Sequence, residues 1–417
     1  MKLRDMFGYS LRGVLAGIDI GTITTTTVVV RQEDGKMRVI GVGSAPSAGM
    51  RRGMVVNAEE AAHSLRRSLH AASRSSGVPI RSAIVGIGGA HLGSFTTRGA
   101  VAVSRADGEI TEDDVGRAVA AAEGLIPKNP NREIVHLIPH QFKVDGQPAI
   151  LDPVGMVGMK LEVEVLGVDA ARPALANIIK CCELAGIEIE DWASSTLASA
   201  ELLLSREQKE LGAMLLDLGA GTSDFAVFEE GRLVDVGAFP NGGGHITADI
   251  AIGLRMPVRA AEELKIHHAQ AITDRVGGRR EHIQLADFVS GETTVLATRD
   301  LVDIVAARLT DIFELSTKSL KKIGRAGLLP GGVVLSGGVA DISGIQDLAR
   351  RELKLPVEVA KAVAVEGMAD VLPSRLAVPV GLILWRVHHP GPLASRGSGQ
   401  WGGIGERIKR MLRAFVP

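Results

Sequence analysis

Two short runs of the chain combine a carboxylate, glycines and hydroxyl side chains at a similar spacing. Residues 19–24 read Asp-Ile-Gly-Thr-Ile-Thr, and residues 217–222 read Asp-Leu-Gly-Ala-Gly-Thr. Glycines let backbone N–H groups approach an anion closely, and threonine hydroxyls add further donors. A carboxylate beside such a turn repels phosphate, so its natural role is to hold Mg²⁺ or a metal-bound water. Together the two runs predict a polyphosphate site.

Each run lies between two apolar, β-rich segments, which are 14–18 and 25–30 in the first half and 214–216 and 225–228 in the second. This pattern predicts two β-hairpins whose turns carry few side chains. A single turn of this kind is often an ordinary hairpin turn. Two copies in matching context favour two related domains that clamp a nucleotide. Neither run is a G-x-x-x-x-G-K-[ST] loop or opens a helix, which argues against P-loop and Rossmann sites.

A third glycine pair follows a strand pattern in the second half. Residues 332–336 are typical of a buried strand, which ends at Gly337 and Gly338, and a helix is expected from about residue 343. Glycines between a strand and a helix N-terminus allow a flat ring or a phosphate to lie against the backbone. These two glycines therefore join the candidate site.

Composition sets the broad class of the protein. The chain has 417 residues, 46% hydrophobic and 23% charged, which predicts two or more soluble domains with sizeable cores. A net charge of −1 gives no overall attraction to nucleic acid or membrane. Adjacent Cys181 and Cys182 make no disulfide framework, so we expect a reducing cytoplasm, and no run reaches the roughly 18 apolar residues of a membrane span. The histidine pairs 267–268 and 388–389 are expected on the surface.

Strand and helix patterns alternate along the chain, which favours an α/β architecture. Within it, 92–168 has the pattern of a small α+β insertion, and 251–315 is more helical and polar. The pattern predicts helices over 58–74, 111–124, 172–185, 197–204 and 301–322, strands over 83–87, 134–144 and 161–168, and an exposed loop over 277–281.

With both hairpins and the Gly337-Gly338 strand end, the chain resembles the actin/chaperone/sugar-kinase ATPase fold. Within that fold it is similar to the FtsA family of bacterial division proteins, over about residues 14–417. The stretches that carry the resemblance are 17–21 (Gly-Ile-Asp-Ile-Gly), 49–56 (Gly-Met-Arg-Arg-Gly-Met-Val-Val), 152–156 (Asp-Pro-Val-Gly-Met), 216–222 (Leu-Asp-Leu-Gly-Ala-Gly-Thr), Gly243 with 247–251 (Thr-Ala-Asp-Ile-Ala), and 261–265 (Ala-Glu-Glu-Leu-Lys).

The resemblance implies an actin-like α/β fold with two related core subdomains, each carrying an inserted subdomain, and a nucleotide cleft between them. The implied parts are a first core at 14–92 plus 168–212 with its insertion at 93–167, a second core at 213–250 plus 316–387 with its insertion at 251–315, a flexible linker at 388–400, and an amphipathic membrane-targeting helix at 401–417.

The same resemblance implies ATP and Mg²⁺ as cofactors. Asp19 and Asp217 are expected to face the metal and to contact it through water. Glu262 and Lys265, one helical turn apart, match a pair that reaches the ribose and adenine, although their spacing fits an ordinary surface ion pair equally. The remaining expected cofactor contacts surround the phosphates or underlie the adenosine: Gly21, Thr22, Thr24, Gly219, Gly221, Thr222, Gly243, Gly337 and Gly338.

One segment departs from the catalytic pattern of related ATPases. Chaperone-type and filament-forming relatives carry an acidic or amide residue before the helix at about Leu197, where it orients the attacking water. Residues 194–199 here read Ser-Ser-Thr-Leu-Ala-Ser. Serine and threonine can position water but are poor bases near neutral pH. We therefore expect strong ATP binding with at most slow hydrolysis, and assign no catalytic residue.

The C-terminal segment has a composition of its own. Residues 390–400 are rich in proline, glycine and serine, which is typical of a flexible linker. On a helical wheel of 401–417, an apolar stripe is bordered by cations, which predicts a helix lying on an anionic membrane surface, with a partner-protein helix as the alternative. The residues are Trp401, Ile404, Ile408, Met411, Leu412 and Phe415 on the stripe, and Arg407, Lys409, Arg410 and Arg413 around it.

The resemblance also implies partners. They are the C-terminal tail of FtsZ on the 251–315 insertion, later division proteins on the 93–167 insertion, and further copies of this chain in a polymer at the cytoplasmic face of the plasma membrane, at the septum. Arg308 matches a position where relatives carry a basic residue for the FtsZ tail, although a solvated arginine fits equally. No nucleic acid partner is expected.

Two other functions stay open at this point. An actin-fold scaffold of another membrane machine, such as a pilus-assembly ATPase, would keep the nucleotide site and change the partner. A sugar-kinase-like phosphotransferase would share both hairpins, but it needs a carboxylate base beside a sugar cleft and has little use for a tethered basic helix.

Overall fold

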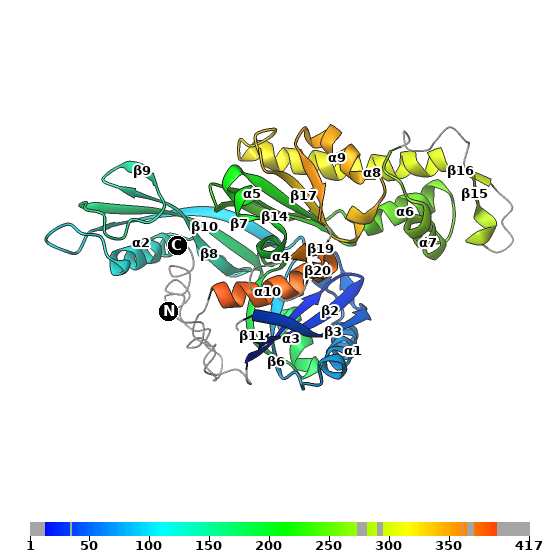
Figure 1. The fold of residues 1–417 in the computed structure, drawn as a ribbon, viewed down its shortest axis with the longest axis horizontal. Coiled ribbons are helices and arrows are strands. Elements are labelled where there is room, and N and C mark those ends of the chain that lie inside the picture. Colours follow the sequence, from blue (N-terminus) through cyan, green and yellow to red (C-terminus); the bar gives the residue numbers. More distant parts are fainter. Residues whose placement is uncertain are drawn as a thin grey trace.

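Two five-stranded sheets with the same strand order form the centre of the molecule in the computed structural model (Figure 1). In each, three consecutive strands pair antiparallel and two later strands add in parallel beside the first of them. The first sheet holds β1 (Val14–Ile20), β2 (Thr24–Glu33), β3 (Lys36–Pro46), β6 (Ser82–Ile87) and β11 (Glu188–Ser194), and the second holds β12 (Ala213–Leu218), β13 (Ser223–Glu229), β14 (Arg232–Phe239), β17 (Gly332–Ser336) and β18 (Val357–Val359).

The structure describes residues 13–389, apart from 34–35, 273–281, 290–294, 361 and 365–370. The expected loop at 277–281, all but the first two residues of the linker expected at 388–400, and the amphipathic helix expected at 401–417 lie outside the described residues. Among the helices in the described ranges, none is long and apolar enough to cross a membrane.

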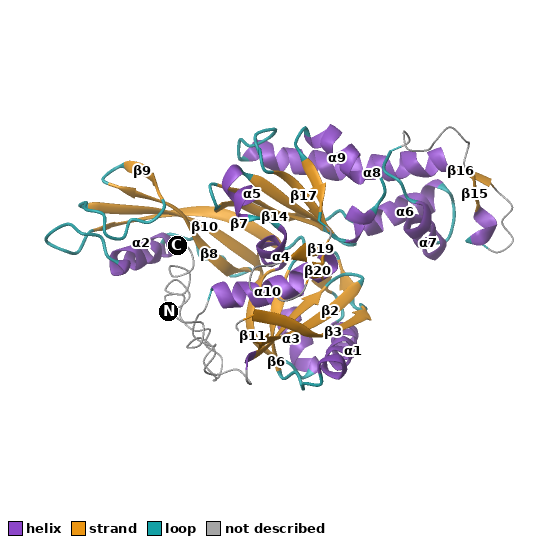
Figure 2. Cartoon of the chain, viewed as in Figure 1, coloured by secondary structure: helices purple, strands orange, loops and turns teal. Residues whose placement is uncertain are grey.

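Helices cover the outer faces of the sheets and fill the space between them (Figure 2). Helix α10 approaches β1 and α4 closely, because Gly17 and Gly381 leave room. A β-carbon at Gly381 would lie 1.9 Å from the carbonyl oxygen of Ala198. The helices of the two cores are α1 (Ala58–Ser76), α3 (Arg172–Ala185), α4 (Ser195–Leu203), α5 (Arg206–Leu211), α8 (Thr298–Lys322), α9 (Ile345–Leu353) and α10 (Ala377–His388).

A four-stranded antiparallel sheet extends from one side of the first core (Figure 1). Helix α2 (Glu112–Gly124) lies on it, and Gly99 lets the helix approach β7, since a β-carbon there would lie 2.1 Å from the Ala118 carbonyl oxygen. This sheet lies in the segment where the first insertion is predicted. Its strand order is β7-β10-β8-β9, formed by β7 (Leu92–Ala102), β8 (Arg132–Val144), β9 (Gln147–Ile150) and β10 (Lys160–Ala171).

At the opposite end of the molecule, the N-terminal part of α8 packs with two further helices and a small hairpin (Figure 1). These are α6 (Gly243–Gly253), α7 (Val258–His268), β15 (His282–Gln284) and β16 (Val295–Ala297). Four further short strands are β4 (Met50–Arg51), β5 (Met54–Val55), β19 (Ala362–Ala364) and β20 (Val371–Pro373).

Every helix and strand predicted over the described residues is present, with ends shifted by at most three residues. The local reasons are visible in the caps. Asn57 accepts hydrogen bonds from the backbone of Glu59 and Glu60 at the start of α1, and Gly77 ends that helix at φ 68°. A carboxamide at the first position and a left-handed glycine after the last are typical helix boundaries.

The prediction that the histidine pair 388–389 lies on the surface is wrong for His389. Its ring is buried and stacks on Trp385 with ring centroids 3.9 Å apart, and its Nδ1 donates to the Trp385 carbonyl oxygen at 2.9 Å. The tryptophan also contacts His136 of β8, at 5.0 Å between centroids. Residue 389 follows Trp385 by one helical turn, so its ring covers the indole.

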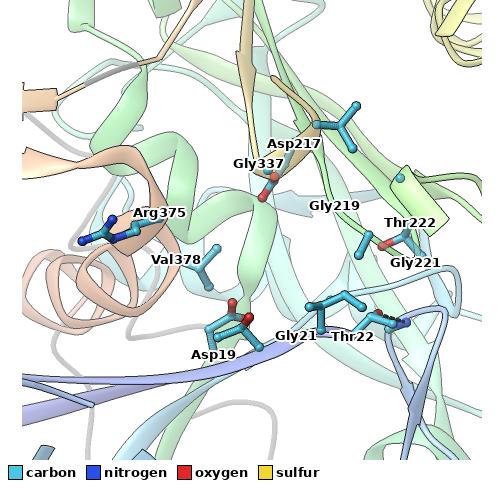
Figure 3. A pocket seen from close by; sticks show the side chains of 18 of the residues that line it. Asp19, Gly21, Thr22, Asp217, Gly219, Gly221, Thr222, Gly337, Arg375 and Val378 are labelled. Carbon is cyan, nitrogen blue, oxygen red and sulfur yellow. Dashed lines mark hydrogen bonds between the residues drawn. The ribbon is translucent and has the colours of Figure 1, made fainter. Parts of the chain in front are cut away.

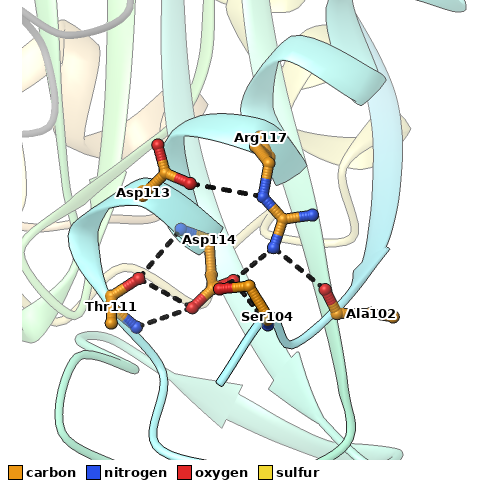
Figure 4. A network of polar contacts seen from close by, with 6 residues as sticks. All are labelled: Ala102, Ser104, Thr111, Asp113, Asp114 and Arg117. Carbon is orange, nitrogen blue, oxygen red and sulfur yellow. Dashed lines mark hydrogen bonds and ion pairs between the residues drawn. The ribbon is translucent and has the colours of Figure 1, made fainter. Parts of the chain in front are cut away.

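A buried carboxylate fixes the first turn of α2 (Figure 4). Asp114 accepts hydrogen bonds from the backbone N–H and hydroxyl groups of Thr111 and Ser104, at 2.8–3.0 Å, and pairs with Arg117. Burial acts to raise the pKa of Asp114, but these hydrogen bonds outweigh it and hold the pKa below its usual range. The ionised carboxylate therefore ties the helix N-terminus to the end of β7.

We expect Asp114→Asn to lower the free energy of unfolding by about 1–3 kcal/mol at pH 7, because charge-assisted bonds are lost in a buried site. Since the pKa is depressed in the folded state, this contribution is present above pH 4 and is lost as the pH falls further. Urea unfolding at pH 7 and at pH 3 measures both effects. Exposed Asp113→Asn is the control, and equal losses in the two variants would contradict the role assigned to Asp114.

Candidate functional site

A cavity of about 720 Å³ lies between the two central sheets. Both hairpin turns, the end of β17 and the helices α4, α6, α7 and α10 contribute to its wall. All thirteen residues predicted to contact the cofactor line it: Asp19, Gly21, Thr22, Thr24, Asp217, Gly219, Gly221, Thr222, Gly243, Glu262, Lys265, Gly337 and Gly338. The structure thus brings together residues that lie more than 300 positions apart in the chain.

The two hairpin turns meet across the cavity (Figure 3). The N–H of Gly21 donates to the carbonyl oxygen of Thr24 at 3.1 Å, which closes the first turn. The second turn comes so near that a β-carbon at Gly221 would lie 2.5 Å from the Thr22 hydroxyl oxygen. Apart from Ile23, the two turns carry only glycine, alanine and threonine side chains, and they leave a narrow space with N–H and hydroxyl groups, which suits an extended anion.

The strand end at Gly337 requires a glycine for two reasons. Its φ of 81° lies in the left-handed region, where a side chain is strained. A β-carbon there would also lie 2.4 Å from the Asp217 Oδ1 and 2.5 Å from the Leu218 carbonyl oxygen. The backbone of β17 therefore runs directly beside the second hairpin, as the glycine pair predicted.

Glu262 and Lys265 form an ion pair of 2.7 Å on α7, facing the first turn of α6. The Lys265 Nζ also donates to the Thr247 hydroxyl at 2.9 Å and to the Gly243 carbonyl oxygen at 3.2 Å. This pair differs from an ordinary surface ion pair, because the lysine is 12% exposed and both side chains line the cavity. It joins α6 and α7 at the wall of the site.

Three carboxylates share the interior of the cavity. Burial, then the charges of Asp217 and Asp224, raises the pKa of Asp19 to about 7. Burial raises the pKa of Asp217 to about 6 and that of Asp224 to about 7, against hydrogen bonds from Ser336 and Thr222. Like charges gathered in a partly buried site favour a bound cation, and carboxylate oxygens are ligands that Mg²⁺ takes, so the residues present fit this ion. Within the described residues, no three or more acidic, histidine or cysteine side chains are arranged to hold a metal by themselves.

Sequence reasoning missed Asp224. Its carboxylate accepts hydrogen bonds from the Thr222 hydroxyl at 2.7 Å and from the N–H of Gly89 at 3.1 Å, so it joins the second hairpin to the end of β6. Asp224 is the direct cross-strand partner of Asp217. Counting the hairpin register back from its turn would have found it, because cross-strand partners face the same side of a sheet.

Two further parts of the wall are informative. Ser195 and Thr196, at the start of α4, both line the cavity, and the buried Thr196 hydroxyl has no hydrogen-bond partner among the described residues. This is the segment predicted to lack a water-orienting acid or amide. Arg375 also lines the cavity, close to α10 (Figure 3). It lies in a short segment between β20 and α10, and no motif in the sequence singled it out.

Arg308 lies outside the cavity, on α8. Its guanidinium makes two hydrogen bonds to the carboxylate of Asp249 on α6, at 2.6 Å and 3.0 Å, and a third at 3.1 Å to Asp311. The alternative of a freely solvated arginine is therefore wrong, since the side chain is only one quarter exposed. The pair connects α8 to the helix whose first residue, Gly243, lines the cavity.

Comparison with known proteins identifies the family. Residues 89–168 match the domain family described as "SHS2 domain inserted in FTSA", and residues 214–380 match "Cell division protein FtsA". A protein of the latter name from Pseudomonas aeruginosa is 34% identical over 375 residues, which is 89% of either chain. The chain belongs to the FtsA family. An FtsA from Bacillus subtilis is 37% identical over 343 residues, 82% of this chain and 77% of the relative.

Solved structures confirm the predicted actin-like fold of this FtsA family member. The structure titled "PilM-PilN type IV pilus biogenesis complex" covers 90% of this chain and 99% of its own, with a TM-score of 0.64 and 18% identity. MreB5 of Spiroplasma citri bound to ADP covers 89% and 96%, with a TM-score of 0.53 and 16% identity. At these identities the likeness establishes the fold, while the FtsA relatives establish a role in cell division.

The raised carboxyl pKa values predict how the cation-free protein responds to pH. Between about pH 4 and pH 7, the folded state keeps protons that the unfolded chain has lost, so stability falls as the pH rises through this window. Asp224→Asn should remove part of that fall and raise the free energy of unfolding by about 1–3 kcal/mol at pH 7.5 in EDTA.

Urea unfolding from pH 4.5 to pH 7.5 measures this effect, with exposed Asp113→Asn as the control. If the pH profile of Asp224→Asn coincides with that of the unmodified chain, the Asp224 carboxyl makes no pH-dependent contribution to the free energy of unfolding.

Proposed function

We propose that this chain is an actin-like, ATP-binding division protein that assembles on itself at the membrane. There it tethers FtsZ filaments through the FtsZ C-terminal tail and helps to recruit later division proteins. The observation that carries the proposal is the cavity between the two hairpins, which gathers all thirteen expected nucleotide contacts in a chain of the FtsA family. A nucleotide-bound neighbour of the same fold supports it further.

In this proposal the turn residues of both hairpins bind the phosphates, with backbone N–H groups and the hydroxyls of Thr22 and Thr24 as donors. Thr222 contributes through its backbone, because its hydroxyl donates to Asp224. Glu262 and Lys265 contact the ribose and adenine, and Gly337 and Gly338 support the adenosine. Mg²⁺, when bound, neutralises phosphate charge, and Asp19 and Asp217 hold it through water. Asp224 fits the same role from the second hairpin.

The proposed ATPase activity is slow at most. Positions 195 and 196 line the cavity and hold Ser and Thr, where hydrolytic relatives carry an acid or amide that orients water. Hydroxyl groups are weak bases near neutral pH. ATP then acts mainly as a ligand that favours one conformation and supports assembly.

We expect the chain to bind ATP while turning it over far more slowly than the roughly 1–10³ s⁻¹ of ordinary enzymes. Thr196→Gln places an amide at the buried hydroxyl and should raise single-turnover phosphate release about tenfold or more. Thr196→Val, which keeps the shape without the hydroxyl, is the matched control. Turnover of the unmodified chain within the ordinary range would refute the assignment.

The proposed FtsZ-tail contact is Arg308. Its partner Asp249 and the exposed Ile252 lie three residues apart on α6, so they share one face beside the guanidinium. A basic group next to exposed apolar surface fits a short acidic and hydrophobic peptide. The carboxylate of Asp249 occupies the guanidinium in the free chain and therefore competes with such a peptide.

Because of this competition, Asp249→Asn should raise the affinity for an FtsZ C-terminal tail peptide about threefold to tenfold, and Arg308→Ala should lower it by a similar factor. Fluorescence anisotropy of the labelled peptide measures both. Arg350→Ala, which removes an exposed arginine on α9, is the control. Unchanged affinity in both test variants would place the tail elsewhere.

Membrane attachment is assigned to the segment 401–417. Its apolar stripe contributes part of the roughly 1.5–3 kcal/mol available per fully buried side chain, and each cation adds about 1 kcal/mol near anionic lipid. Ordering the helix and losing free motion oppose this, so one copy binds weakly. Several copies in one polymer gain avidity, which links self-assembly to attachment at the cytoplasmic face of the membrane.

The alternative of a pilus-assembly scaffold rests on the fold shared with the PilM-PilN complex, at 18% identity. Sequence relatives at 34–37% identity carry the FtsA name and favour the division role.

A further inference from the structure

The outer end of the first insertion exposes a concentration of apolar side chains. Among the described residues, fifteen large apolar side chains are exposed, and four of them fall within nine consecutive positions: Leu151, Val154, Val157 and Met159. Val157 and Met159 are 72% and 82% exposed. They lie two positions apart, on either side of the buried Gly158, and both side chains are exposed to solvent. We call this group the tip patch.

Backbone pairing places the tip patch beside an acidic segment. Val157 pairs with Glu109 across an isolated bridge, and the N–H of Ile110 donates to the Met156 carbonyl oxygen at 2.8 Å. The two segments that meet here, 105–117 and 143–162, carry four basic and eight acidic side chains, one of which is the buried Asp114. An exposed apolar patch with negative surroundings suits an amphipathic, basic partner.

The chain carries such a partner in its own C-terminal segment. Residues 401–417 have four basic side chains against one acidic, around an apolar stripe. The complementarity covers both properties, since apolar groups meet apolar groups and the net charges are opposite. A membrane surface offers the same two properties, so the tip patch and an anionic membrane compete for one face of the segment.

The segment can reach the tip patch. Its linker leaves the described structure at His389, whose stacking partner Trp385 contacts His136 on β8. From His136 the strand runs to Val144, whose side chain lies against Gly158. Eight residues of strand span about 27 Å. The eleven residues of 390–400 have a root-mean-square span of roughly 18 Å and a limit near 36 Å.

We propose that residues 401–417 dock on the tip patch of the same chain and thereby hide their apolar stripe when no membrane is present. The membrane half of this inference rests on the proposed function, whereas the docking half does not. Docking within one chain benefits from a local concentration in the millimolar range, so even a weak contact is populated. Binding to vesicles must then overcome the docked state.

The test uses the full chain. In a variant with Ile408→Ser and Phe415→Ser, the chain's own tail no longer competes, and a fluorescent synthetic peptide of residues 401–417 is titrated into it. We expect saturable binding that weakens with added salt and becomes at least about tenfold weaker when Val157→Ser and Met159→Ser are added. Leu211→Ser with Leu328→Ser, exposed apolar positions elsewhere, is the matched control.

A second arm measures co-sedimentation with phosphatidylglycerol vesicles. With the native tail, Val157→Ser and Met159→Ser should tighten vesicle binding several-fold, and the Ile408→Ser, Phe415→Ser chain should not sediment. The inference is overturned if the peptide fails to bind, if it binds the tip-patch variant equally well, or if that variant changes only the oligomeric state, which would assign the patch to a second copy. Peptide docking without any vesicle binding would support docking and refute the proposed membrane role.

Discussion

Three half-buried carboxylates line the cavity between the two sheets, and the charge that they place there is the constraint on which the site depends. Asp19, Asp217 and Asp224 are only partly exposed and lie in one cavity wall, and burial raises the pKa of each. Such an arrangement is unfavourable in the isolated chain and becomes favourable when a cation and a polyanion fill the space. A ligand bound there would join the two sheets that present these residues. The hydrogen bond from the N–H of Gly89, just after β6, to Asp224 already links the two sides of the cavity.

Much of the site could be predicted because it depends on local rules. The runs from Asp19 and from Asp217 specify hairpins through alternating β-rich segments and side-chain-poor turns, and the Gly337 strand end follows from one backbone conformation. Each of these features is determined by a few consecutive residues. That the two hairpins face each other was predictable only because the motif occurs twice. The two copies lie in sheets with the same strand order.

Other parts depend on tertiary contacts that no local pattern carries. Asp224 lies in an ordinary strand, and its role appears only when it is paired with Asp217. His389 follows an apolar helix, and its sequence position suggests an exposed polar residue, but its ring stacks on that of Trp385. Arg308 has a helical face typical of solvent exposure, and its carboxylate partner Asp249 lies 59 positions away.

The salt bridge between Arg308 and Asp249 has a thermodynamic consequence. Helix α6 has its first residue, Gly243, in the wall of the cavity and Asp249 less than two turns later, against α8. A peptide that takes Arg308 from Asp249 alters the restraint on a helix whose N-terminus touches the ligand space. Any coupling free energy that follows must be reciprocal: whatever factor a peptide contributes to nucleotide affinity, the nucleotide returns to the peptide. Binding of the peptide and binding of the nucleotide would then be thermodynamically coupled, so that neither affinity could change without the other.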